Sequence, residues 1–221
     1  EFKRISAHRE FSVSRNLFRT LNDSHSKEFV VRAPAGESWS VESKPEWVEV
    51  TPMEGVGKVD VTVKTHVLDS RADNRAGEVV FLLNDKGYRY TMTVEQYDYQ
   101  YGDGDIIVNQ TATEGKGINV VFMGDCFDAR DIANGSYLAG VEEAIVHYFA
   151  IEPYKTCKPY FNIYTVFGMS ADSGMGTVNT IKDAKFGSQY SLDGISPDHA
   201  TCYEYAMKAE TVNEDNLGET L

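Results

Sequence analysis

The sequence predicts two different units in succession: an all-β, immunoglobulin-like β-sandwich at the amino-terminal side and an incomplete α/β domain after it. Two observations carry this prediction. Short alternating runs separated by turn residues fill the first half, from Phe11 to Val94. A strand–helix–strand pattern begins after residue 117. We therefore expect a sandwich over residues 1–98, a connector over 99–116 and a truncated α/β domain over 117–221.

The first half alternates apolar and polar residues in the manner of half-buried strands. Val59, Val61 and Val63 are separated by polar residues, and Tyr88 to Val94 repeats this period of two. Further candidate strands and the turns between them occur at Glu28–Arg32, Ser38–Val41, Trp47–Val50 and Gly77–Leu83, with turns at 34–36, 44–45, 54–55 and 84–87. Six to seven strands at this spacing are typical of a β-sandwich.

The second half reads as a β-α-β unit. Ile118 to Met123 is a continuous apolar run between two glycines, which predicts a buried strand. Apolar residues from Tyr137 to Phe149 recur at helical spacing, and Phe161 to Phe167 predicts a second buried strand. A further short helix is predicted over 200–209. Because two strands rarely make a stable sheet, we expect the domain to be unfinished at Leu221.

Composition and charge narrow the classes of function. Hydrophobic residues at 42% and charged residues at 25% are typical of a folded globular chain. Residues 99–221 carry 7 Lys and Arg against 18 Asp and Glu, a balance of −11, whereas residues 1–98 carry only −2. An acidic surface repels phosphate backbones, so we expect no nucleic-acid partner.

No apolar run approaches the length of a transmembrane segment. The chain opens at Glu1 without Met, so either a leader was removed or the sequence omits it.

The candidate binding residues follow the two strands of the second half. Asp125 comes after the first strand, and Ser170, Ser173 and Gly174 lie in a polar loop after the second. The carboxyl ends of strands are where α/β sheets build sites. Asp125 could satisfy nearby backbone N–H groups, act as a metal ligand or general base, or belong to a nucleophile turn. In the last case Cys126 would replace the serine of GDSL-type esterases.

The first half resembles a BACON module. The resemblance covers about residues 9 to 98 and follows the order Trp39-x-Val41, Trp47 to Val50, Pro52-x-x-Gly55, Arg75-x-Gly77 and Val94-Glu-Gln96. It implies a loose association with carbohydrate, for which Trp39 and Trp47 would be stacking residues. The alternating valines around both tryptophans favour a role in the core instead.

The second half is similar to the opening of the IgA-peptidase-type zinc metallopeptidases, over about residues 103 to 210. The matching residues, in order, are Asp103-Gly104, Gly115-x-Gly117-Ile118, Met123-Gly124-Asp125, Phe127, Asp131-Ile132, Tyr137, Phe149-x-Ile-Glu-Pro-Tyr154, Tyr160-Phe-Asn-x-Tyr164, Ser170, Ser173-Gly174 and Phe186-Gly187. The resemblance implies a zincin-like fold and a secreted, periplasmic or outer-surface hydrolase, for which a lipid anchor is one expectation. It also implies that protein or glycoprotein substrates are cleaved by a zinc-activated water.

The chain itself lacks the zinc motif His-Glu-x-x-His. No two of its five histidines are four residues apart; they are His8, His25, His66, His147 and His199. In the family this motif follows the matched region, so we expect zinc in the full-length enzyme but no bound metal, no catalytic residue and no activity in this fragment. Cys126 also departs from the family, which usually has Gly there.

Two alternatives remain open. The chain could be a surface glycan-binding or adhesion protein with a non-catalytic peptidase-like half. It could also be a GDSL-esterase-like hydrolase that uses Cys126 as its nucleophile.

Overall fold

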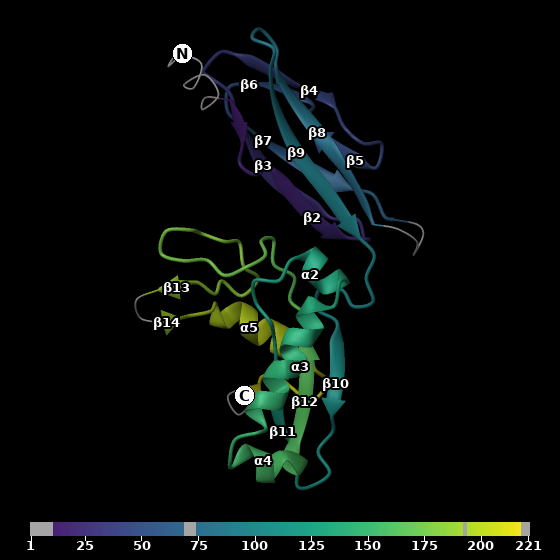
Figure 1. Ribbon diagram of the computed structural model, residues 1–221, viewed down its shortest axis with the longest axis vertical. Helices are drawn as coiled ribbons and strands as arrows, with labels where there is room; N and C mark the ends of the chain where they lie inside the picture. The colour runs from purple at the N-terminus through teal and green to yellow at the C-terminus, as the bar shows by residue number, and fades with distance from the viewer. Residues whose placement is uncertain (1–10, 69–73, 192–193, 218–221) are drawn as a thin grey trace. The chain divides into compact units, whose positions relative to one another are not determined.

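The computed structural model describes residues 11–68, 74–191 and 194–217 (Figure 1). The chain divides into two compact units, Glu1–Asp98 and Tyr99–Leu221. Strands hold 38% of the described residues and helices 17%. The predicted fold class, a sandwich followed by an incomplete α/β zincin-like domain, is wrong. The described residues are mostly β with several sheets, and they include few, short helices and no clear zincin domain.

The described part of the first unit is made of two sheets. Its strands are β1 (Ser12–Val13), β2 (Leu17–Leu21), β3 (Ser26–Arg32), β4 (Ser38–Ser43), β5 (Val48–Thr51), β6 (Glu54–Val56), β7 (Val59–Thr65), β8 (Arg75–Leu83) and β9 (Tyr88–Tyr97). One sheet has the order β1-β3-β7-β5 and the other β2-β9-β8-β4-β6. All neighbours are antiparallel except β2 and β9.

One apolar core lies between these sheets. Val61 and Val63 are fully buried in β7 while Asp60, Thr62 and Lys64 are exposed, so the alternation predicted for this strand is confirmed. Trp39 is also fully buried and packs edge-on against Phe81 at 6.1 Å between ring centroids.

The turn expected at 54–55 belongs instead to a short strand, β6. Gly55 lies opposite Trp39 in the register of β4 and β6. A Cβ atom on Gly55 would come within 2.7 Å of the indole ring, so only glycine fits beside this tryptophan.

The second unit combines short helices with small sheets. Its elements are β10 (Ile106–Gln110), β11 (Ile118–Phe122), α2 (Ala129–Ala133), α3 (Ser136–Tyr148), α4 (Tyr154–Cys157), the 3₁₀ turn η1 (Lys158–Tyr160), β12 (Phe161–Val166), β13 (Tyr190–Ser191), β14 (Gly194–Ile195) and α5 (His199–Ala206). The strands β11 and β12 are parallel, and β10 pairs with the other edge of β12 in the antiparallel sense. The strands β13 and β14 form a separate pair.

The predicted strand–helix–strand run is present as β11, α3 and β12, but it does not grow into an α/β domain. The third strand, β10, comes from the stretch expected to be a connector and makes the sheet mixed. Among the helices of the described residues, α3 alone, with 13 residues, has an ordinary length; α5 has 8 residues, α2 has 5 and α4 has 4. The hydrophobic period predicted β11, α3 and β12 one at a time. It carried no information on how many further strands pair with β11 and β12.

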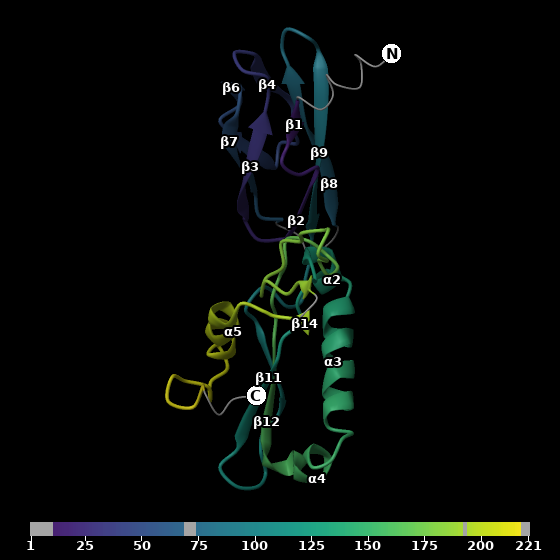
Figure 2. The same ribbon diagram turned by 90° about the vertical axis from the view of Figure 1, so that its left-hand side faces the viewer.

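Helices cover both faces of the three-stranded sheet. Figure 2 shows α3 on one side of β11 and β12 and α5 on the other. On the α3 side, Phe149 packs on Phe161 with centroids 5.3 Å apart. On the α5 side, Ala206 packs with Tyr164, and Tyr205 packs with Val166. All six residues of β12 are therefore buried. Across the described ranges, no helix combines the length and the apolar character that crossing a bilayer requires.

Candidate functional site

The carboxyl ends of β11 and β12 meet at a network of hydrogen bonds centred on Asp125. The Asp125 Oδ1 atom accepts bonds from the Cys126 backbone N–H (2.8 Å), the Ser170 hydroxyl (3.0 Å) and the Phe186 backbone N–H (3.1 Å). The Oδ2 atom accepts one from the Ser188 backbone N–H at 2.9 Å. We call this carboxylate and its four donors the Asp125 network.

The Asp125 network keeps its carboxylate ionised. Burial raises the pKa of Asp125, but the bonds donated by Ser188, Phe186 and Cys126 lower it by more, so the net shift is downward. Four donors from the chain occupy the two oxygens. In this arrangement Asp125 holds the loop at 186–188 against the end of β11, as in the interpretation that it satisfies nearby N–H groups.

The predicted binding residues lie close together in the structure, and their polar groups form hydrogen bonds with other residues of the second unit. The Ser170 hydroxyl donates to Asp125 and accepts bonds from the backbone N–H groups of Cys126 (3.1 Å) and Lys185 (2.9 Å). The Gly174 N–H donates to the Cys126 carbonyl at 2.8 Å, and the Ser173 carbonyl accepts a bond from Lys182 Nζ at 3.1 Å. Their role in substrate binding stays a prediction.

Tyr137, which the sequence placed on the apolar face of a helix and in the resemblance but not among the candidate site residues, joins the two parallel strands at the same end. Its hydroxyl donates to the Val166 carbonyl (2.7 Å) and accepts bonds from the N–H groups of Gly124 (2.9 Å) and Gly168 (3.1 Å). The side chain is fully buried, and burial raises its pKa to about 12. The sequence held one signal for this role. A tyrosine on the apolar face of a helix needs a hydrogen-bond partner for its hydroxyl once that face is buried.

A second polar group, also missed, links three distant segments of this unit. The Asp103 Oδ2 atom accepts bonds from Lys185 Nζ (2.9 Å) and the Tyr205 hydroxyl (2.7 Å). Lys185 Nζ also donates to the Tyr205 hydroxyl at 2.8 Å. Burial lowers the pKa of Lys185, but its bonds to Tyr205 and Asp103 raise it by more. The lysine is therefore a cation at neutral pH and ties α5 to the loop before β10.

Cys126 occupies a strained and buried position. Its φ is +66°, the one positive value for a non-glycine residue among the described residues. The side chain is 7% exposed, and its sulfur lies 3.9 Å from the Ser188 carbonyl oxygen. Burial and the neighbouring Asp125 charge raise the pKa of the thiol. These conditions favour the protonated thiol over a nucleophilic thiolate.

This environment predicts slow chemical labelling of Cys126. At neutral pH the folded protein should react with a thiol reagent at Cys126 at least about tenfold more slowly than at the half-buried Cys157. Mass spectrometry of peptides from briefly labelled protein measures the ratio, and unfolded protein should label at both. Rapid labelling of folded Cys126 would instead favour the esterase-like alternative.

The backbone at Cys126 also predicts an order of stability between two substitutions. Cys126→Gly and Cys126→Ala both delete the sulfur, but only glycine adopts a positive φ without a steric cost. We expect Cys126→Gly to have a free energy of unfolding about 1 kcal/mol above that of Cys126→Ala in urea denaturation. The matched control is Cys202, inside α5, where alanine should be the more stable by about 1 kcal/mol. The same order at both positions would contradict this explanation.

The described histidines do not form a zinc site. His8 lies outside the described residues, and His25 is half-buried. His66 bonds to Glu49 at 2.7 Å, His147 is exposed on α3, and His199 is exposed at the start of α5. Within the described ranges, no three His, Cys, Asp or Glu side chains lie close enough together to hold a metal ion. These residues therefore do not fit the zinc that the resemblance implies.

The two tryptophans of the first unit differ in how far their rings are covered. Trp39 is fully buried in the core. Trp47 is partly buried, and the Arg75 guanidinium carbon lies 4.4 Å from its ring centroid. A sugar ring could stack on Trp47 only from the side that Arg75 leaves open.

Comparisons with known proteins return distant structural likenesses only. No family model matches the chain, and no curated protein matches it. A Bacteroides ovatus GH5 xyloglucanase is similar over 49% of this chain and 26% of its own length, with 16% identity and a TM-score of 0.37. The Vibrio cholerae VesB protease is similar over 43% of this chain and 34% of its own, with 13% identity and a TM-score of 0.29. A C. elegans MSP family member is similar over 39% of this chain and 95% of its own, with 11% identity and a TM-score of 0.29. The chain thus spans about a quarter and a third of the first two proteins, and at these scores the likenesses carry no argument about function.

Proposed function

We propose that this chain is the amino-terminal portion of a secreted or surface zinc peptidase that hydrolyses peptide bonds, and that the chain supplies structural support while later residues supply the zinc ligands. The proposal rests on the resemblance of residues 103–210 to the IgA-peptidase-type metallopeptidases and of residues 9–98 to BACON modules. The described residues hold no zinc site of their own, so no catalytic step is assigned to them.

The observation that carries the proposal is the convergence of the resembling motifs in space. Gly124-Asp125, Ser170 and Phe186 belong to three stretches of the resemblance that are about 45 and 16 residues apart in the chain. All three meet at the Asp125 network, and Tyr137, from a fourth stretch, bonds to Gly124 beside it. Adjacent parallel strands bring Asp125 and Ser170 together in any family, so the contacts that favour the resemblance are those of Phe186 and Tyr137, which do not follow from the strand order. Their convergence supports a shared structural unit.

The test is the reading frame beyond the codon for Leu221 and the activity of the protein that it encodes. We expect a His-Glu-x-x-His motif in that frame, and peptide hydrolysis that a chelator abolishes and zinc restores. The 221-residue chain should be inactive in the same assay. A longer protein without the motif, or hydrolysis by the 221-residue chain that survives replacement of its histidines, would contradict the proposal.

A further inference from the structure

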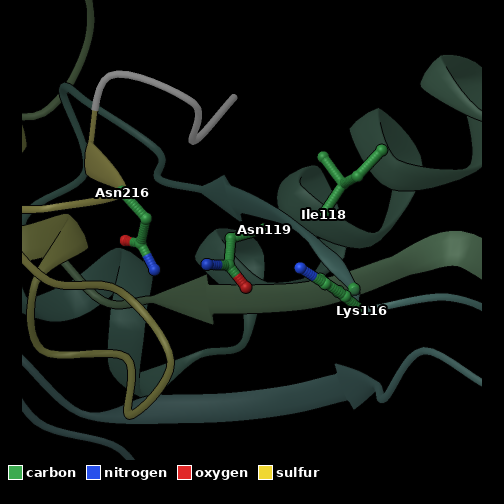
Figure 3. A pocket seen from close by; sticks show the side chains of 5 residues that line it. Lys116, Ile118, Asn119 and Asn216 are labelled. Carbon is green, nitrogen blue, oxygen red and sulfur yellow. The ribbon is translucent and has the colours of Figure 1, made fainter.

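A pocket of about 450 Å³ lies at the beginning of β11. It is lined by Lys116, Gly117, Ile118, Asn119 and Asn216. Figure 3 shows the Lys116 amine on one side of the Asn119 amide and the Asn216 amide on the other, while Ile118 points away. The pocket is far along the strand from the Asp125 network, which lies at the opposite end of β11.

The wall of this pocket is held in place by a chain of amide contacts. Asn162 Nδ2 donates to Asn119 Oδ1 at 3.0 Å, and Asn162 Oδ1 accepts the Ala112 N–H at 2.9 Å. The Asn119 Oδ1 atom also accepts the Thr211 hydroxyl at 2.7 Å. Gly117 has φ +84° and passes so close to Asn162 that a Cβ atom would lie 2.4 Å from its Nδ2. The pocket is therefore preformed, which lowers the entropic cost of binding.

The strand that borders the pocket is an open sheet edge. Among the described strands β11 pairs with β12 alone, through five successive residue pairs without a register shift. Alternate residues of such an edge strand turn their N–H and C=O groups away from the sheet, where another chain can pair with them. The opposite edge strand, β10, has a register shift between Val108 and Gln110 that disfavours further pairing.

The charge at the pocket favours a carboxylate. No carboxylate of the described residues forms an ion pair with the Lys116 ammonium, and none lines the pocket. Asn119 uses its oxygen for two bonds and donates one of its two amide hydrogens to the Thr211 carbonyl. The groups that remain for a ligand are consequently the Lys116 ammonium and the second amide hydrogen of Asn119.

We propose that this pocket receives the free carboxyl terminus of an extended peptide that adds to β11 as an antiparallel strand. Lys116 precedes β11, so a peptide whose last residue meets Lys116 and which continues along Ile118–Phe122 runs against the strand. The unit around the pocket has a balance of −11, which favours basic side chains before the peptide terminus and leaves Lys116 to offset the repulsion of its carboxylate. The inference is independent of peptidase activity, because it concerns binding by this chain alone.

The test uses the 221-residue chain and a labelled, lysine- and valine-containing hexapeptide in two forms, with a free and with an amidated carboxyl terminus. Fluorescence anisotropy should give at least about tenfold tighter binding for the free form, a preference that added salt weakens. Lys116→Gln should reduce the preference to about twofold or less. Lys155→Gln, an exposed lysine on α4, should leave it unchanged.

Backbone NMR decides whether the peptide occupies the edge of β11. The amide shifts that move on titration should map to residues 116–122. Equal binding of the two peptide forms, or shifts confined to other strands, would overturn the proposal. A dimer detected by sedimentation, whose formation prevents the peptide from binding, would also overturn it.

Discussion

Asp125→Ala is expected to lower the free energy of unfolding of the second unit by about 3 kcal/mol. The substitution removes the acceptor for the N–H groups of Phe186 and Ser188 and for the Ser170 hydroxyl. A buried donor left without an acceptor costs about 1 to 3 kcal/mol, and partial relaxation of the loop keeps the total below the full sum. Urea denaturation measures the change. Hydrogen exchange should show that the Phe186 and Ser188 amides lose protection.

The control for Asp125 is Glu143, an exposed carboxylate on α3. Glu143→Ala should change stability by less than about 0.5 kcal/mol. If Asp125→Ala cost no more than Glu143→Ala, the Asp125 network would not organise the ends of the strands.

The ionisation of Asp125 adds a pH dependence with a definite sign. Its folded pKa lies below the ordinary value of 3.8, so the carboxylate contributes stability that is present above pH 3.8 and is lost as the pH falls through the folded pKa. Unfolding measured between neutral pH and pH 2 should therefore show a steeper loss of stability in the wild type than in Asp125→Asn. A steeper loss in the Asn variant would contradict this assignment.

Tyr137→Phe is expected to cost about 2 to 4 kcal/mol. The phenyl ring keeps the packing against Phe127 and Phe167, at 5.2 and 4.8 Å between centroids, so the variant isolates the hydroxyl. Without that hydroxyl, the Gly124 and Gly168 N–H groups and the Val166 carbonyl lose a shared partner. Chemical denaturation followed by near-ultraviolet circular dichroism measures the loss.

Tyr160→Phe is the matched control, because Tyr160 is 46% exposed. It should change the free energy of unfolding by less than about 0.5 kcal/mol. A cost below about 1 kcal/mol for Tyr137→Phe would show that water replaces the hydroxyl, and that the junction of β11 and β12 does not depend on it.

Much of the local structure followed from the pattern of residues. The run at Ile118–Met123 predicted β11, the helical period from Tyr137 predicted α3, and the alternation of Val59, Val61 and Val63 predicted β7. Asp125 and Ser170 were singled out because each follows a buried strand, and parallel strands bring such positions together.

The partners of these residues had no comparable signal. Phe186 and Ser188 bind Asp125 through backbone N–H groups, which every residue except proline carries, so side-chain identity says nothing about them. The fold class failed for a related reason. The residues of Ile106–Gln110 carry no signal that this strand pairs with β12. Because that pairing makes the sheet mixed, the mixed sheet could not be predicted from the sequence.

The sequence by itself determined part of the secondary structure, including β7, β11, α3 and β12, because hydrophobic period and turn residues act over a few positions of the chain. It also determined the acidic character of residues 99–221 and the spacing of the histidines. Only the tertiary structure decided the order of the strands, the left-handed backbone at Cys126 and the partners of Asp125 and Tyr137. Those features depend on contacts between segments tens of residues apart, which local preference does not encode.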